Sequence, residues 1–570
     1  MLAFDKVHYS IYLHSRNTFM RQHAYFAAVH RGMNNLAHVR RTTDKFNFSH
    51  VAHLHHHPSK LSKLFVHILF HANTMTRLPS LARRLWLFGL IWIILCTTFY
   101  RADSFTVSTS TSSSSASTAV WKNDDDKRPA PQGLYVHIPF CRRRCRYCDF
   151  AIVPIGNLRE EVVDDNDNIP RAQQTKLLFQ TYTDAIVQEI RSLAISRNNE
   201  TDDDVDRKVC LETLYFGGGT PSLAPLSMLQ TIMDAIRQSF TLSDNLEFTM
   251  EMDPGTFDLD KLKGFQALGV NRISLGVQSF NDTVLEYLGR FHRQRDIQQS
   301  LECIKQVYGC NDSVNYSLDL IASLPGVSLA DWCATLTTAT TQLDPPPRHI
   351  SVYDLTIEEG TVFGKWYEDE EKDYARPTIS STMASILPLP TPKESAFMYQ
   401  YTSGYLRAAG YEHYEISSYA QQGYRSRHNS LYWGYDTMWY AAGLGAASWV
   451  DSQRVSRPRA MADYVHWIQN GQPALARDEE DEEEDSILSR LQNVVLTRLR
   501  TKEGLDLDWV RHRFGPAYAQ AIARGARPED FPSLVAYESP NLRLVDSTGF
   551  LFSNMVLSSI FLELEDVEAT

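Results

Sequence analysis

The chain has 570 residues, enough for two or three domains, and 43% of them are hydrophobic, which is ordinary for a globular protein. Its net charge of −12 argues against a general nucleic-acid binder. Eight cysteines, most of them scattered, argue against a disulfide framework. The acid excess lies in the later part of the chain, because residues 1–101 carry thirteen Lys and Arg but only two acids, Asp5 and Asp44.

The N-terminal region divides into two segments. Residues 1–74 hold twelve of the nineteen histidines and show no helix or strand period, so we interpret them as a non-native or disordered extension. The alternative is a metal site in the tract His53–His57, although no acid or cysteine flanks it. Residues 75–130, read from Met75, have the order of a targeting peptide: a basic stretch, a short apolar run and a Ser/Thr-rich leader. The run is too short to span a bilayer comfortably, so we expect no integral membrane segment in the mature protein.

From Leu134 onward, short apolar runs alternate with amphipathic stretches. We predict strands at Leu134–Pro139, Thr213–Phe216, Leu246–Met252, Arg272–Val277, Val314–Ile321 and His349–Leu355. We predict helices at Tyr182–Ile195, Ser227–Phe240, Leu259–Leu268, Thr283–Leu288, Asp296–Tyr308 and Ala330–Leu343. This alternation predicts a parallel sheet with right-handed crossovers. Six units are too few for a closed eight-stranded barrel, so the expected fold class is α/β, an open (β/α)6 partial barrel over residues 131–385 with ligands at the carboxyl ends of its strands.

Polar stretches divide the remaining chain. Residues 153–176 are interpreted as an insertion, and Pro388–Pro392 as a turn-rich linker that precedes a segment at residues 393–475. The acidic run 478–485 is interpreted as a solvated loop, with a recruitment role as the alternative. A helix predicted at Ser486–Arg500 opens a smaller mixed C-terminal domain over residues 486–570.

Three cysteines follow the first predicted strand at C-x3-C-x2-C spacing: Cys141, Cys145 and Cys148. Three thiolates can hold three irons of a [4Fe–4S] cluster and leave the fourth iron open to a small molecule. Zinc, a disulfide and chance spacing are the alternatives, and structural zinc wants four ligands. The arginines interspersed among the cysteines either favour thiolates or form a basic docking face.

Polar residues also follow the later strands. The run Gly217–Gly219 comes after the second strand, and successive glycines let a backbone approach a ligand closely, although alone such a run is usually a tight turn. Glu251 ends the third strand and Gln278 follows the fourth. Asp319 lies inside the apolar fifth strand, where a charge is costly without a partner.

Together with the block Tyr135-x-His137-Ile138-Pro139-Phe140-Cys141, these motifs resemble the HemN/HemW branch of the radical S-adenosylmethionine (SAM) superfamily. The resemblance runs from about Leu134 to about Trp449 and resumes weakly near the C-terminus. It implies a cluster on the three cysteines and SAM as cofactor, which the reduced cluster cleaves to a 5′-deoxyadenosyl radical. It implies SAM contacts from Tyr135, Gly218, Gly219, Thr220, Glu251, Gln278, Arg290 and Asp319.

Two features favour the HemW side of this branch. Phe150 stands where the coproporphyrinogen oxidases (HemN) carry a fourth cysteine. The segment His428-Asn429-Ser430-Leu431-Tyr432-Trp433 resembles the H-N-x-x-Y-W motif of HemW, which implies haem binding that involves His428. A histidine beside aromatic rings suits an axial haem ligand, and the alternative is a packed histidine at a domain junction. The segment Gly443–Ser448 resembles a glycine-rich segment of the family but lacks the histidine often found there.

The resemblance therefore implies a haem chaperone that binds haem, transfers it to apo-haemoproteins and takes electrons from a donor such as ferredoxin or flavodoxin. Two alternatives remain: an oxygen-independent coproporphyrinogen III oxidase of porphyrin biosynthesis, and a cluster-bearing structural protein without SAM chemistry. The order of signal peptide, Phe105 and Ser/Thr-rich leader resembles the bipartite plastid-targeting sequences of algae. We expect a plastid location, with the mitochondrion or cytoplasm as alternatives.

Overall fold

The computed structural model describes residues 130–156, 171–198, 208–309, 314–367, 386–451, 453–471 and 486–568. The N-terminal extension, nearly all of the targeting peptide, the centre of the insertion and the acidic run lie outside these ranges. Within the described residues, none of the helices is both long enough and apolar enough to cross a membrane.

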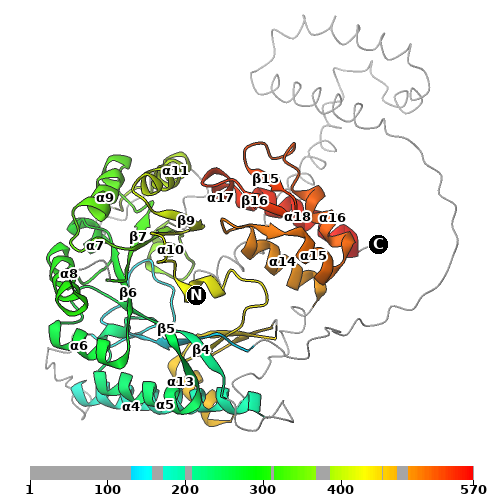
Figure 1. The fold of residues 1–570 in the computed structure, drawn as a ribbon. Coiled ribbons are helices and arrows are strands. Elements are labelled where there is room, and N and C mark those ends of the chain that lie inside the picture. Colours follow the sequence, from blue (N-terminus) through cyan, green and yellow to red (C-terminus); the bar gives the residue numbers. More distant parts are fainter. Residues whose placement is uncertain are drawn as a thin grey trace, which may run out of the picture. The chain divides into compact units, whose positions relative to one another are not determined.

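A run of parallel strands forms the framework of the structure (Figure 1). The strands are β1 (Gly133–Ile138), β4 (Cys210–Gly218), β5 (Thr241–Met252), β6 (Arg272–Gln278), β7 (Tyr316–Ala322) and β8 (His349–Asp354). They lie side by side in chain order, and every neighbouring pair is parallel. Each overlaps a strand expected from the sequence, which confirms the open partial barrel.

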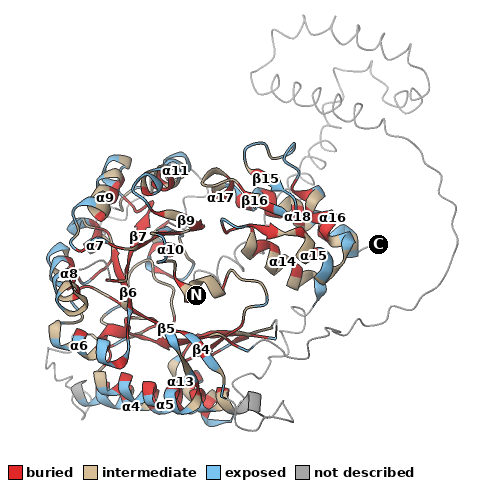
Figure 2. Ribbon diagram, in the orientation of Figure 1, coloured by how far each residue is buried: buried red, intermediate tan, exposed pale blue. Residues whose placement is uncertain are grey.

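Helices connect these strands and lie along one side of the sheet (Figure 1). They are α4 (Arg171–Asn198), α5 (Leu226–Ser239), α6 (Leu259–Leu268), α7 (Asp282–Tyr287), α8 (Gln294–Tyr308) and α9 (Leu329–Thr341). Local sequence fixes their ends. Asp258 accepts a hydrogen bond from Lys261 N at the start of α6, and Gly269 ends that helix with a φ of 112°. Ser328 and Asp331 form a capping box that begins α9. Figure 2 shows buried residues concentrated in the strands and on the sheet-facing sides of the helices.

The segment after the barrel adds strands to both edges of the same sheet. The added elements are α11 (Pro392–Ala408), β9 (Glu412–Glu415), β10 (Ser418–Ala420), α12 (Arg427–Leu431), β11 (Trp439–Ala442), β12 (Ala447–Val450), β13 (Gln453–Ser456) and α13 (Met461–Gln469). Strand β11 pairs with β1, and β10 pairs with β8, so the sheet has eleven strands. Helix α11 begins at Pro392 within the predicted linker, where Thr391 and Glu394 form a capping box. Helix α10 (Val362–Tyr367) follows β8.

Alternation along the strands separates an apolar face from a polar one. The residues that join the main apolar core on the helix-covered face include Leu214, Phe216, Phe248, Met250 and Leu318. The intervening positions carry Thr213, Tyr215, Glu247, Glu251, Arg272, Ser274, Ser317, Asp319 and His349. These side chains are buried or partly buried and mostly polar. The interior of the partial barrel is therefore a polar compartment, which must satisfy its own hydrogen bonds or those of a ligand.

The C-terminal elements have an apolar core of their own, which includes Leu491, Val510, Ile522 and Leu557. They are α14 (Ile487–Arg498), β14 (Leu505–Asp506), α15 (Leu507–Phe514), α16 (Pro516–Gly525), β15 (Val535–Glu538), β16 (Asn541–Leu544), α17 (Thr548–Leu551) and α18 (Ser553–Glu568). The predicted helix at Ser486–Arg500 corresponds to α14, and the remainder is mixed as expected.

Candidate functional site

The three cysteines lie on a loop closed by pairing of β2 (Phe140–Cys141) with β3 (Val153–Pro154). Cys148 N donates to Cys145 O at 3.2 Å, and Arg146 N donates to Leu288 O at 3.0 Å, which fixes the loop on the barrel. All three thiols are partly buried. No three His, Cys, Asp or Glu side chains in the described ranges surround a common point as they would for a single ion. In a [4Fe–4S] cluster each thiolate binds a different iron, so this donor set still fits a cluster.

Burial is the dominant influence on two of these thiols. It raises the pKa of Cys148 to about 11 and raises that of Cys141 further, while the Arg144 and Arg290 charges lower the pKa of Cys148 only in part. Burial thus favours the protonated form of the Cys141 and Cys148 thiols without metal, against the expectation that the arginines favour thiolates. Iron bound to the sulfurs would displace those protons.

The arginines of the cysteine loop anchor it through hydrogen bonds to main-chain carbonyls. Each guanidinium donates to a main-chain carbonyl, at distances of 2.7–2.9 Å. The pairs are Arg142 to Gly255, Arg143 to Arg290, Arg144 to Phe150, and Arg146 to Tyr287. Arg143 and Arg144 nevertheless remain exposed.

The glycine run packs against the start of the cysteine loop. A Cβ atom on Gly219 would lie 2.6 Å from the carbonyl carbon of Pro139, and Gly218 has a φ of 111°. Gly218 N donates to Glu251 Oε2 at 2.9 Å. Thr220 Oγ1 lies 3.6 Å from Cys141 Sγ, so the structure brings the glycine run, Glu251 and the cysteine loop together.

Glu251 is a carboxylate in a dry environment. Burial raises its pKa to about 7, although the hydrogen bonds from Gly218 N and the Tyr215 hydroxyl oppose that shift. Tyr215 Oη donates to Glu251 Oε1 at 2.9 Å. A carboxylate of this kind binds a cation well, because the cation restores the charge balance that burial removed.

Arg290 reaches the same site through an acid that the sequence interpretation missed. Its guanidinium forms an ion pair with Asp253 and donates to Gly276 O at 2.8 Å and to Cys145 Sγ at 3.9 Å. Arg290 Nε and Gln278 Oε1 are buried and have no hydrogen-bond partner among the residues that the structure describes. Such unsatisfied atoms at the strand ends suit a polar ligand, and Gln278 adopts a φ of 66° there.

Asp319 points into the polar interior and finds the partners that its burial requires. It accepts hydrogen bonds from Ser274 Oγ at 2.6 Å and Ser317 Oγ at 3.0 Å. Burial raises its pKa despite these bonds. Asp319 and Glu251 thus lie on one face of the sheet, on strands that are two apart.

His428 lies at the other end of the barrel. It belongs to α12, and its Nδ1 is 2.8 Å from Thr213 Oγ1 near the amino end of β4. Its ring stacks on Tyr215 with centroids 5.1 Å apart and meets Tyr432 edge-on at 5.4 Å. The imidazole has no exposed surface, Nε2 has no partner, and burial lowers its pKa to about 3. The donor and aromatic walls suit an axial haem ligand, although the buried Nε2 would have to become accessible before haem could bind it.

Tyr135 and the glycine-rich segment are joined to the cysteine loop through buried His137. Tyr135 Oη lies 3.1 Å from His137 Nδ1, and His137 Nε2 lies 2.8 Å from Ala151 O, just beyond the cysteines. In the turn between β11 and β12, Leu444 N donates to the Tyr182 hydroxyl at 3.2 Å, and that hydroxyl donates to His137 O at 2.6 Å. The segment that follows the barrel therefore helps to hold the cluster loop.

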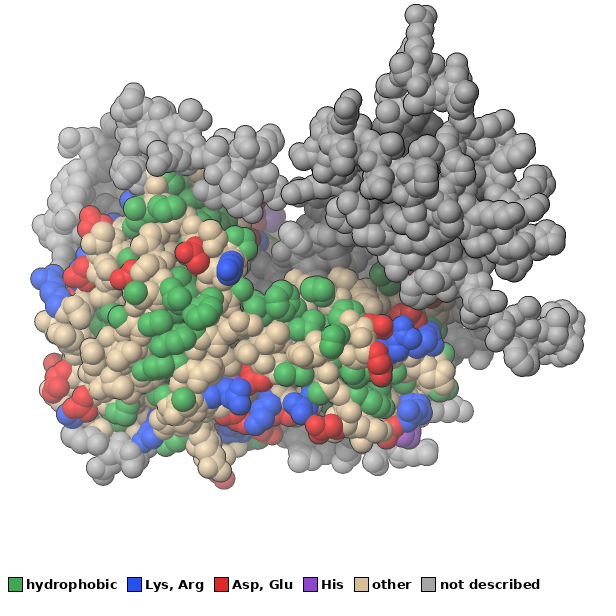
Figure 3. Space-filling view, turned by 90° about the horizontal axis from the view of Figure 1, so that it is seen from above, with side chains coloured by type: hydrophobic (Ala, Val, Ile, Leu, Met, Phe, Trp, Pro, Cys, Tyr) green, Lys and Arg blue, Asp and Glu red, His purple; other side chains and the backbone are tan. Residues whose placement is uncertain are grey.

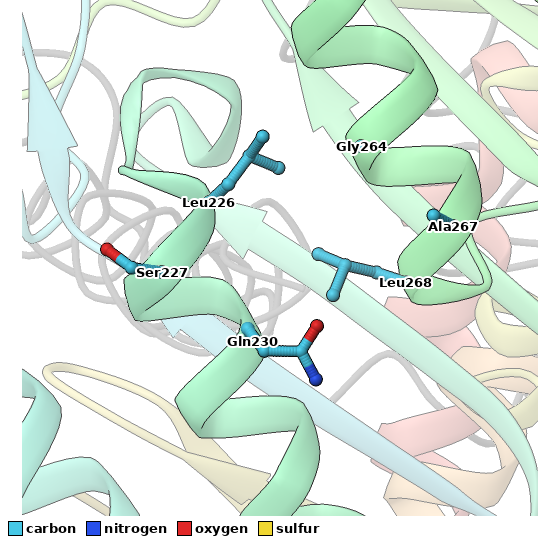
Figure 4. A pocket seen from close by; sticks show the side chains of 6 residues that line it. All are labelled: Leu226, Ser227, Gln230, Gly264, Ala267 and Leu268. Carbon is cyan, nitrogen blue, oxygen red and sulfur yellow. The ribbon is translucent and has the colours of Figure 1, made fainter.

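One groove on the outer surface lies away from these residues. This groove of about 300 Å³ between α5 and α6 is lined by Leu226, Ser227, Gln230, Gly264, Ala267 and Leu268 (Figure 4). These residues belong to the helix layer. On the face seen in Figure 3, acidic and basic side chains are interspersed rather than gathered by sign.

Comparisons with known proteins agree with the geometry. Residues 135–339 match the radical SAM superfamily model. The heme chaperone HemW of Synechocystis is 34% identical over 455 residues, which cover 76% of this chain and 98% of that protein. HemW of Bacillus subtilis is 31% identical, with 66% of this chain and 88% of that protein covered. A mitochondrial radical SAM domain-containing protein 1 from Bos taurus is 32% identical over 54% of this chain and 59% of that protein.

Among solved structures, the coproporphyrinogen III oxidase HemN of Escherichia coli superposes with a TM-score of 0.57 at 21% identity, covering 76% of this chain and 91% of that one. At this identity the likeness concerns the fold. The superfamily match implies a [4Fe–4S] cluster and SAM as cofactors. The identity and coverage shared with the Synechocystis protein establish that the chain belongs to the HemW family of radical SAM proteins.

Proposed function

We propose that this protein is a haem chaperone, which binds haem and transfers it to apo-haemoproteins. The observation that carries the proposal is His428, a neutral histidine whose Nε2 has no partner and whose ring lies between Tyr215 and Tyr432. Neutral imidazole nitrogen is a common axial ligand of haem iron, and aromatic walls suit the macrocycle. The relatives named as heme chaperones support the assignment.

In this proposal Cys141, Cys145 and Cys148 would hold the cluster, which when bound would supply one-electron chemistry toward SAM. Glu251 receives the cationic amino end of SAM, and Gly218 N keeps that carboxylate oriented. Gln278 Oε1 and Arg290 Nε have no protein partner and are available to the ligand. Tyr135, Gly219, Thr220 and Asp319 complete the site.

The electron donor docks at the exposed edge of the cysteine loop. Phe291 is 47% exposed, and Arg142 and Arg143 lie 4.2 and 5.8 Å from its ring centroid. Arg293 and Arg143 both donate to Arg290 O, which gathers their charges beside Phe291. An apolar centre ringed by arginines suits an acidic protein such as a ferredoxin or flavodoxin.

Haem binding is tested by an anaerobic titration of the cluster-reconstituted protein, followed by the Soret band. We expect stoichiometric uptake by the wild type, weaker uptake by His428→Ala, and an altered ligand-field spectrum for His428→Gln, which preserves the side-chain volume better. His466→Ala, at an exposed residue of α13, is the control and should bind like the wild type. Unchanged uptake by His428→Ala, or no specific uptake at all, contradicts the proposal, and coproporphyrinogen III is then the next ligand to test.

The plastid is the proposed location, on the basis of the leader from Met75. A fluorescent protein fused behind residues 75–130 should enter plastids in an alga with secondary plastids. Deletion of Phe105 should retain the fusion short of the plastid. Accumulation in mitochondria or cytoplasm contradicts this location.

A further inference from the structure

One side chain connects the proposed SAM site with His428. Tyr215 donates its hydroxyl to Glu251 Oε1 at 2.9 Å, and its ring stacks on the His428 ring at 5.1 Å with an interplanar angle of 29°. The Tyr215 ring also stacks on the Tyr135 ring, with centroids 5.9 Å apart. Tyr215 is only 8% exposed, so it has little room to move independently of its neighbours.

A second buried path joins the other carboxylate of the site to the same short helix. Ser317 Oγ bonds Asp319 at 3.0 Å and lies 2.8 Å from His349 Nδ1. His349 Nε2 lies 2.8 Å from the Tyr414 hydroxyl, and Ser426 N, at the cap of α12, donates to that hydroxyl at 3.4 Å. Both proposed SAM-binding carboxylates therefore reach α12 through the barrel interior.

Helix α12 is short, depends on contacts with its neighbours and carries a buried atom with no hydrogen-bond partner among the described residues. It has five residues, and Glu247 accepts the first two of its N–H groups, from Arg427 at 3.0 Å and His428 at 2.9 Å. The buried Nε2 of His428 has no partner, which disfavours the closed position. A helix this short keeps its place through tertiary contacts, which include the Glu247 bonds, the Arg427 guanidinium on Asn245 O at 2.6 Å, the Thr213 bond and the Tyr215 stack. Of these, the Tyr215 stack is the contact that also reaches Glu251.

We propose that Tyr215 is a positioning residue that couples SAM occupancy to His428: bound SAM holds α12 in the barrel, and departure of SAM releases His428 toward haem. The inference rests on the proposed function, in which His428 is the haem ligand. The direction of the coupling, in which bound SAM opposes haem binding, follows from the Tyr215 hydrogen bond. A cation beside Glu251 favours the ionised carboxylate, and a hydroxyl bonds an ionised carboxylate more strongly than a neutral one. The raised pKa of Glu251, about 7, leaves room for that change near neutral pH.

Linkage makes the effect reciprocal. If SAM weakens haem binding by some factor, haem weakens SAM binding by the same factor. We expect that factor to be about fivefold or more, the lower end of measured couplings.

The test measures haem affinity by Soret titration with and without saturating SAM, and SAM affinity by calorimetry with and without haem, using the cluster-reconstituted protein. Tyr215→Phe retains the ring and loses only the bond to Glu251, so SAM should affect its haem affinity less than twofold. Tyr316→Phe is the matched control, since Tyr316 is a fully buried tyrosine whose hydroxyl donates to Pro345 O at 2.7 Å, and it should retain the full coupling. Tyr414→Phe, which cuts the second path, should reduce the coupling in part.

Amide hydrogen exchange supplies a measurement that needs no haem. SAM should slow exchange across Arg427–Leu431 in the wild type and in Tyr316→Phe, but not in Tyr215→Phe. If haem affinity is insensitive to His428→Ala, the proposed function fails, while the exchange result still judges the coupling. If His428 binds haem but SAM changes neither haem affinity nor exchange, or if Tyr215→Phe behaves like the wild type, the coupling through Tyr215 is overturned.

Discussion

The buried ion pair between Glu189 and Arg457 yields the sharpest stability prediction. Both side chains have no exposed surface, and Arg457 Nε donates to Glu189 Oε1 at 2.7 Å. The other oxygen of Glu189 accepts from Gly443 N at 2.8 Å and from the Tyr464 hydroxyl at 2.7 Å. One carboxylate on α4 therefore fixes the β11–β12 turn, the strand end at Arg457 and α13. The neighbouring residue Leu444 N donates to Tyr182, whose hydroxyl donates to His137 O.

Glu189→Gln retains the volume but removes the negative charge that the buried Arg457 guanidinium faces. Breaking a buried pair in this way costs about 3–5 kcal/mol. At about 2 °C per kcal/mol, the low end for large domains, Tm should fall by about 6–10 °C. Because the turn contacts the His137 network, retention of the cluster should decline as well.

The assay is thermal unfolding followed by circular dichroism, together with the 400 nm absorbance of the reconstituted cluster. Glu563→Gln is the control, because Glu563 pairs with Arg524 at 2.7 Å on the surface, where both side chains are at least 36% exposed. An exposed pair of this kind contributes about 0–1 kcal/mol, so the control should unfold close to the wild type. A Glu189→Gln protein that unfolds together with this control would refute the argument.

Three further predictions follow from single positions. Gly219→Ala should weaken SAM binding at least about tenfold in calorimetry, because its Cβ would lie 2.6 Å from a backbone carbonyl carbon, whereas Gly404→Ala, which meets nothing within 4 Å, should bind normally. The SAM affinity should rise as pH rises through about 7, because Glu251 ionises there, and Glu251→Gln should abolish that dependence. In the ligand-free protein, stability should change with pH in the opposite direction. Because folding raises the pKa of Glu251, this carboxyl stabilises the folded protein at low pH, and that stabilisation is lost as pH rises through about 7. Tm measured against pH tests this. Gly525→Ala should destabilise the C-terminal elements by about 1–3 kcal/mol in denaturant titrations, since its Cβ would lie 2.6 Å from Ile560 Cα.

The strands of the barrel were predictable because each is a long apolar run between turn-forming residues, and their pairing in chain order follows from the crossover rule. The edge strands β9 to β13 were not, since they have three or four residues each and take their partners from distant parts of the chain. The start of helix α11 was not predicted, because its prolines suggested a linker. Thr391 and Glu394 have the spacing of a capping box and would have indicated a helix start.

The same distinction applies to the site. The residues that follow strand ends, such as Glu251 and Gln278, could be placed from the order of motifs. Asp253 lies in the same short motif as Glu251. Its ion pair with Arg290 could not be predicted, because it depends on how the chain folds after β6. Tyr215 was treated as one of a run of apolar strand residues. Strict alternation with Leu214 and Phe216 would have assigned it to the polar face.

If His428 is the proposed haem ligand, its position is compatible with a radical SAM site in the same barrel, because the two lie apart on β4. Thr213, which holds His428, and Gly217, which begins the glycine run, are four residues apart on β4. At about 3.3 Å per residue this separates the two ends by ~13 Å. Haem iron at His428 would therefore not meet the reactive end of the barrel directly. Any influence of the cluster and SAM on haem must pass through the side chains of the interior, and Tyr215 is the residue that touches a group at each end.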